Sequence, residues 1–202
     1  LRRRLVSIEE EGVIRRVVER WSPPAAQFGA TLVWEYSPVR LGQDMGRGLR
    51  VSLRIAPYGR WPERVPRLGV RVDMSGSPWE ASWLGETLIG YPDMAVPGAR
   101  GCGHGEASDL WDVGVRPQEG GHRRDVEALS LRGQTGELVV LPASPLGWSV
   151  SPWSERELAQ ASHWEELPAS ERLFLWLDVF QDGIGTRSCG PDSRPEFAGR
   201  MR

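Results

Sequence analysis

The chain has 202 residues, of which 40% are hydrophobic and 26% are charged, and its formal net charge is −2. This globular composition excludes a disordered chain, and the balanced charge lacks the basic footprint of a general nucleic-acid binder. No apolar run approaches the length of a membrane span, and no apolar signal-peptide core follows the basic N-terminal residues, so we expect no membrane association. The two cysteines, Cys102 and Cys189, lie far apart in the sequence and lack a CxxC partner, which favours free thiols in a reduced, cytoplasmic setting.

Short strands are predicted along most of the chain, because apolar and polar residues alternate in many short runs. In chain order, we expect strands over residues 12–21, 32–36, 49–55, 68–74, 126–131, 137–141, 148–150 and 173–180. The run 49–55 alternates without a break and predicts a half-buried antiparallel strand, with one dry face and one solvated face. The run 173–180 is apolar on both faces and predicts a central strand.

Turn residues separate these strands, since the chain contains 24 glycines and 16 prolines at short intervals. One helix is well signalled, because Ser154 and Glu157 have the spacing of a capping box. We see no internal repeat and no convincing linker. The pattern predicts an all-β sandwich or barrel formed as a single domain over residues 1–202.

Five sequence blocks resemble one known family. The central block, residues 115–123, reads V-R-P-Q-E-G-G-H-R and is similar to the "RPQENGN-R" block of the small-chain domain of bacterial β-galactosidases, glycoside hydrolase family two. The other four blocks occur in the family's order, at residues 66–70, 83–93, 149–168 and 177–197. Together the family-like blocks span residues 45–197 with matching spacing.

The resemblance implies a large twisted antiparallel sandwich of the galactose-mutarotase-like class. In that family the sandwich packs on a catalytic TIM barrel, which holds both carboxylates of a retaining mechanism. This chain is therefore expected to work as part of a β-galactosidase, to contain no catalytic residue, and to hold no cofactor, since the family's Mg and Na sites lie mainly in the domains missing here. The implied partners are the β-galactosidase large chain or catalytic domain and a galactoside substrate.

The resemblance also points to a site residue. The family's "GGDDSW" segment, whose tryptophan faces the sugar, reads here as T-R-S-C and ends at Cys189. Cys189 is thus the candidate substrate-binding residue, and by analogy with base stacking the loss of an aromatic contact weakens binding by ~1–3 kcal/mol. The alternative is a loop cysteine without a role. The family's opening "WRAPTDND"-like motif and its last strand are missing, so we expect a sandwich incomplete at both ends, as in a small chain, a fragment or a degenerate copy.

Other candidates carry open alternatives. His163 keeps its family position and is a candidate sugar contact or acid/base, or a residue bonded to backbone. Glu119 is an interface or pocket acid, or a turn residue. Asp93 is expected to accept backbone N–H groups in a turn, and Asp178, within an apolar strand, is expected to need an arginine or backbone donors. No metal site is expected, because Cys102 and the histidines lack the spacing of a ligand set.

Three functions follow as hypotheses. The first is the small-chain domain that completes a β-galactosidase pocket. The second is a non-catalytic carbohydrate-binding or interaction module that has lost the sugar site. The third, by fold analogy only, is an aldose 1-epimerase, which would need His163 and Glu119 to face one cavity.

All basic residues of the chain are arginine, which excludes a catalytic lysine in any of these functions.

Overall fold

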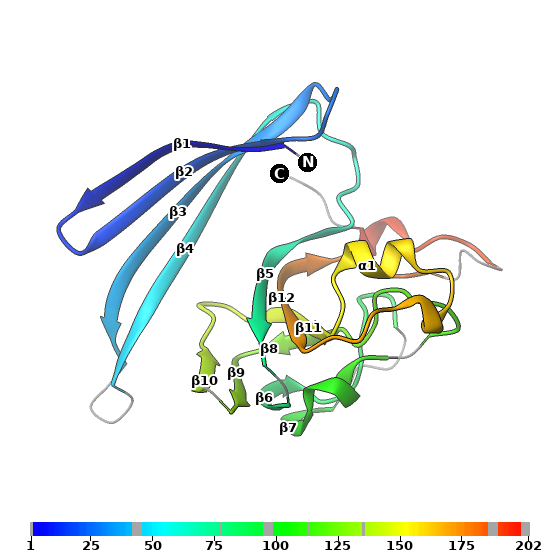
Figure 1. Ribbon diagram of the computed structural model, residues 1–202. Helices are drawn as coiled ribbons and strands as arrows, with labels where there is room; N and C mark the ends of the chain where they lie inside the picture. The colour runs from blue at the N-terminus through cyan, green and yellow to red at the C-terminus, as the bar shows by residue number, and fades with distance from the viewer. Residues whose placement is uncertain are drawn as a thin grey trace. The chain divides into compact units, whose positions relative to one another are not determined.

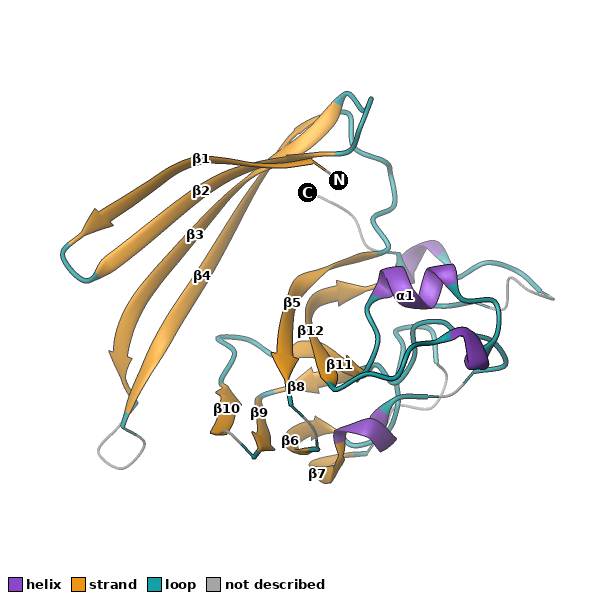
Figure 2. Ribbon diagram, in the orientation of Figure 1, coloured by secondary structure: helices purple, strands orange, loops and turns teal. Residues whose placement is uncertain are grey.

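The structure, a computed structural model, describes residues 2–41, 46–76, 78–94, 99–112, 114–134, 136–185 and 190–198. Contacts within the chain divide it into two compact units, Leu1–Glu63 and Arg64–Arg200. Strands dominate both units, and the described helical segments are short and belong to the second (Figure 2). The all-β sandwich class is confirmed, whereas the single domain over residues 1–202 stays a prediction.

The first unit is one antiparallel sheet of four strands in the order β1-β2-β3-β4 (Figure 1). Its strands are β1 (Arg2–Glu11), β2 (Ile14–Ser22), β3 (Phe28–Arg40) and β4 (Arg47–Gly59). The strand predicted over 49–55 lies in β4, but Leu49 and Val51 are 62% and 50% exposed, so the expected dry face is wrong at this end. Alternation decides which side chains share a face of a strand, and it does not decide whether a second layer covers that face.

The second unit contains two four-stranded sheets, in the orders β10-β9-β6-β7 and β5-β12-β11-β8 (Figure 1). The strands are β5 (Arg67–Ser75), β6 (Trp79–Glu86), β7 (Arg100–Glu106), β8 (Arg123–Val126), β9 (Ala128–Gly133), β10 (Gly136–Val140), β11 (Leu146–Ser151) and β12 (Arg172–Gln181). β12 is an interior strand, as its apolar sequence predicted. The single strand expected over 126–131 is instead parts of β8 and β9, which belong to different sheets and meet at Glu127.

The core of the second unit combines buried side chains from both of its sheets. Leu129 and Leu131 of β9 cluster with Trp148 and Val150 of β11, and each of these four residues is at most 1% exposed. Trp83 of β6 packs edge to face on Trp148, with ring centroids 5.1 Å apart. The two sheets are therefore the layers of a sandwich, held by burial of apolar surface.

A buried cation lies at the edge of this core. The Arg123 guanidinium lies 5.1 Å from the Trp83 ring and 5.6 Å from the Trp148 ring. It donates to the carbonyl oxygens of Leu110 and Gly121, at 3.0 and 2.8 Å. Burial lowers the pKa of Arg123. The charge is accommodated by aromatic faces and backbone carbonyls.

The capping box is confirmed at the start of α1 (Glu155–Gln160). The Ser154 hydroxyl accepts the N–H of Glu157 at 3.3 Å, and the Glu157 carboxylate accepts the N–H of Ser154 at 2.7 Å. The described part of this unit also contains short 3₁₀ helices at Ala107–Leu110, Trp164–Glu166 and Pro195–Phe197. Among the described residues, no helix has the length and apolar character needed to cross a bilayer.

Candidate functional site

The loop that follows β12 is fixed at its start by a carboxylate from another segment. Asp93 accepts the backbone N–H groups of Ile184 and Gly185, at 3.0 and 2.6 Å. Gly183 allows this approach, because a Cβ atom there would collide with the Asp93 carboxyl group. The prediction that Asp93 accepts backbone N–H groups is confirmed.

A second anchor joins the two described ends of the same loop. Arg64 donates to Asp182 through Nη2 and to Asp192 through Nη1, each at 3.0 Å. The hydrogen bond to Asp182 and the charges of both carboxylates raise the pKa of Arg64. A cavity of about 620 Å³ lies beside these anchors and is lined by Asp93, Ile184, Asp192 and their neighbours. Cys189, the candidate sugar-facing residue, lies outside the described residues.

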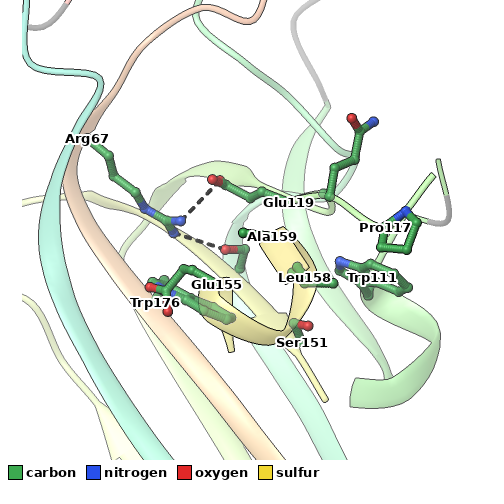
Figure 3. A pocket seen from close by; sticks show the side chains of 12 residues that line it. Arg67, Trp111, Pro117, Glu119, Ser151, Glu155, Leu158, Ala159 and Trp176 are labelled. Carbon is green, nitrogen blue, oxygen red and sulfur yellow. Dashed lines mark hydrogen bonds and ion pairs between the residues drawn. The ribbon is translucent and has the colours of Figure 1, made fainter. Parts of the chain in front are cut away.

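A second cavity, of about 270 Å³, opens between β5, β11, β12 and α1 (Figure 3). Arg67 lies at one end of the cavity. Its guanidinium donates to both carboxylate oxygens of Asp178, at 2.7 Å from Nε and 2.6 Å from Nη2. Asp178 is 1% exposed, so the prediction of an arginine partner for it is confirmed. Burial lowers the pKa of Arg67, but the hydrogen bonds and charge of Asp178 outweigh burial and leave that pKa raised.

Glu119 reaches the same cavity from the 115–123 block. Its Oε1 lies 3.1 Å from Nη1 of Arg67, and Figure 3 shows the two side chains pointing toward each other. Removal of water by the surrounding residues raises the pKa of Glu119, and the Arg67 charge opposes this rise. Since 40% of the Glu119 side chain remains exposed, solvent screens both effects.

His163 is exposed and lies just before the 3₁₀ helix Trp164–Glu166, where its carbonyl oxygen accepts the N–H of Glu166 at 3.1 Å. It lines neither of the two cavities above, whereas Glu119 lines the smaller one. The structure therefore does not bring His163 and Glu119 together in either cavity, which removes the support for an epimerase pair.

Sequence reasoning missed Arg67 and Trp176 as parts of the smaller cavity. Arg67 is separated from Asp178 by 111 residues in the sequence, and no local spacing signals such a pair. The only available signal was the need of a buried carboxylate for a cation. Across the described part of the chain, no group of three or more His, Cys, Asp or Glu side chains could hold a metal ion.

His122 is a buried histidine beside Asp178. Its Nδ1 lies 2.8 Å from the carbonyl oxygen of Gly90, and its ring stacks on Tyr91 with centroids 5.3 Å apart. Nε2 lies 3.9 Å from the Asp178 carboxylate and has no hydrogen-bond partner within the described residues. Burial lowers the pKa of His122, so the neutral ring is the folded form.

We expect His122 to make the fold less stable in mild acid. Its pKa is lowered in the folded protein, and the unfolded chain binds a proton near pH 6.5. The contribution of His122 to the free energy of unfolding is therefore fully present above about pH 6.5. It falls at lower pH, by at most about 1.4 kcal/mol per pH unit. His122→Gln should flatten this dependence in urea unfolding measured between about pH 8 and 5. His104→Gln, an exposed site on β7, is the matched control, and an unchanged slope in His122→Gln would contradict the prediction.

Comparison with known proteins gives one family. The model of the family described as beta galactosidase small chain matches residues 12–201. A curated beta-galactosidase of Arthrobacter sp. (strain B7) is 36% identical over 163 residues, which cover 77% of this chain and 16% of that protein. A beta-galactosidase of Staphylococcus xylosus is 22% identical over 84% of this chain, and one of Oenococcus oeni is 24% identical over 98% of it. The matched segments span 16% and 19% of the lengths of these two proteins.

Proposed function

Because this chain belongs to the beta galactosidase small chain family, we propose that it completes the galactoside-binding pocket of a catalytic domain carried on another segment or chain. The reaction is the retaining hydrolysis of a β-galactoside, and the glycosidase is of family two. Two carboxylates of the catalytic domain act as nucleophile and acid/base. This chain supplies part of the pocket wall, and its partner is the β-galactosidase large chain or catalytic domain.

The observation that carries the proposal is the double anchoring of the loop after β12. Asp93 binds the backbone before residues 186–189, and Arg64 joins Asp182 and Asp192 on the two sides of that segment. Residues that contact substrate need such support, because a contact displaced by even 1 Å loses much of its effect. The anchors thus support a role for the intervening segment, including Cys189, in lining a substrate pocket.

The proposal is tested by complementation. A chromogenic β-galactoside is incubated with this chain, with a β-galactosidase large chain that lacks this domain, and with both together. Hydrolysis should appear only in the mixture, since the carboxylates belong to the partner. Hydrolysis by the pure chain would contradict the proposal. No hydrolysis in any tube, with the chain folded, would favour a carbohydrate-binding or interaction module without the sugar site, which the cysteine at position 189 also favours.

Cys189→Trp is expected to raise kcat/KM of the complemented enzyme by about 5- to 150-fold, which corresponds to ~1–3 kcal/mol of aromatic contact with the sugar ring. The added indole offers the flat apolar face that a cysteine lacks. The control is Cys102→Trp, at the exposed cysteine of β7. Equal effects of the two substitutions, or no effect of the first, would argue against Cys189 as a pocket residue.

A further inference from the structure

We propose that the cavity between Arg67, Trp111, Glu119 and Trp176 binds one neutral sugar ring (Figure 3). Among the described residues, those that line this cavity differ from those that line the cavity beside the loop after β12. This is therefore a saccharide site additional to the proposed galactoside pocket. Its volume of about 270 Å³ lies just below the usual range of ligand pockets, about 300–1,000 Å³, and suits a monosaccharide better than a longer chain.

The apolar wall of the cavity is held in place by contacts within the chain. Trp111, which is 7% exposed, packs edge to face on Trp153 and Trp164, with centroids 5.2 and 4.9 Å apart. Trp164 in turn donates from Nε1 to the carbonyl oxygen of Gly114 at 3.2 Å. Indole rings suit the apolar C–H groups of a pyranose, and a preformed wall keeps the entropy lost on binding small.

The opposite end of the cavity is polar and equally fixed. Arg67 is held by Asp178 and lies over the Trp176 ring, 5.4 Å from its centroid. Glu119 uses Oε1 for Arg67, which leaves its second carboxylate oxygen to accept a ligand hydroxyl. On the Trp111 side of the cavity, the Ser151 hydroxyl oxygen accepts the N–H of Trp153 at 3.0 Å, so its own proton is available to a ligand oxygen (Figure 3). Acceptor and donor groups on one apolar-walled cavity match a ring that carries several hydroxyls.

The charges around the cavity exclude an anionic ligand. Among the described residues that line the cavity, Arg67 contributes one positive charge, and Glu119 and Glu155 contribute two negative charges. The local balance is one negative charge, which repels a sugar phosphate or a sugar acid. An amine could also satisfy this balance, but Glu119 and Glu155 are already paired with Arg67 and Arg71, which favours a neutral polyol.

The test uses the full chain, shown to be folded by circular dichroism, and ligand-observed saturation-transfer NMR. D-Galactose and D-glucose are the neutral probes, galactose 6-phosphate is the anionic probe and glucosamine is the cationic probe. We expect saturable transfer to at least one neutral sugar and at least tenfold weaker binding of the phosphate. No saturable transfer to either neutral sugar, or tighter binding of glucosamine than of both, would overturn the proposal.

A blocking variant tests the location. Ala159 is an exposed residue of α1 that lines the cavity, so Ala159→Trp fills the space without changing a polar group, and binding should weaken at least tenfold. Gln160→Trp adds the same side chain at the exposed neighbour outside the lining and should leave binding unchanged. Unchanged binding in Ala159→Trp would place the sugar elsewhere and overturn the proposal.

A third variant tests the polar contact. Glu119→Gln should weaken binding about tenfold, because a hydrogen bond to a charged acceptor becomes a neutral one. Cys189→Trp should leave this binding unchanged, since described residues on either side of position 189, Gly185 and Pro191, line the other cavity. If complementation fails but sugar binding is lost in Ala159→Trp, only the proposed β-galactosidase role is overturned. If complementation succeeds but no sugar binding sensitive to Ala159→Trp is found, only this site is overturned.

Discussion

Arg67→Leu is expected to destabilise the second unit by about 3–5 kcal/mol. The substitution leaves Asp178, which is 1% exposed, as a buried carboxylate without the cation that binds both of its oxygens. It also removes the donor to the Ser149 hydroxyl, at 3.2 Å. The free energy of unfolding in urea, followed by tryptophan fluorescence, measures the loss.

An exposed ion pair gives the matched control for Arg67. Arg132, whose side chain is 69% exposed, pairs with Glu137 at 3.4 Å, and such surface pairs contribute about 0–1 kcal/mol. Arg132→Leu should therefore change stability little. The double variant Arg67→Leu/Asp178→Leu should recover part of the loss, because it removes the uncompensated charge. Similar losses in Arg67→Leu and Arg132→Leu would contradict a buried pair.

Trp148→Ala is expected to destabilise the sandwich by about 3–5 kcal/mol, since it leaves a large cavity in the core. Trp148 is fully buried and contacts Trp83, and its ring also lies against the Arg123 guanidinium. The loss of this aromatic face exposes a buried cation to a void. Urea unfolding again measures the effect.

Trp148→Phe separates ring packing from hydrogen bonding. Nε1 of Trp148 has no partner within the described residues, so phenylalanine loses no hydrogen bond and keeps a ring against Trp83. The expected loss is about 1–2 kcal/mol, from the smaller ring alone. If Trp148→Phe lowers the free energy of unfolding as much as Trp148→Ala does, packing of a six-membered ring against Trp83 is not what stabilises this part of the core.

The sequence predicted those parts of the fold that depend on local pattern. Alternation located most strands, the two apolar faces of residues 173–180 identified β12 as interior, and the Ser154–Glu157 spacing located the start of α1. β1, β6 and β7 were missed. In β7, glycines occupy alternate positions of R-G-C-G-H-G-E and hide the strand pattern. Which sheet each strand joins was also beyond prediction, since pairing depends on contacts between distant segments.

The candidate site was predictable only in its chemical requirements. A turn aspartate and a buried aspartate both need donors, and Asp93 and Asp178 have them. The identity of the donors depended on the folded arrangement, because Asp93 binds Ile184 and Gly185 across about ninety residues of sequence. Cys189 stays a prediction, since it was inferred from a family position and lies outside the described residues.

The strand order of the two units has a consequence for synthesis on the ribosome. In the first unit each strand pairs with the next one along the chain, so its sheet can form as it emerges. β5, in contrast, pairs with β12, and Arg67 lies opposite Gln181. At ribosomal rates of roughly 5–20 residues per second, β5 waits on the order of 5–20 s for this partner. During that interval the edge of β5 that faces β12 is open to other strands, so β5 is exposed to mispairing during synthesis for longer than the strands of the first unit.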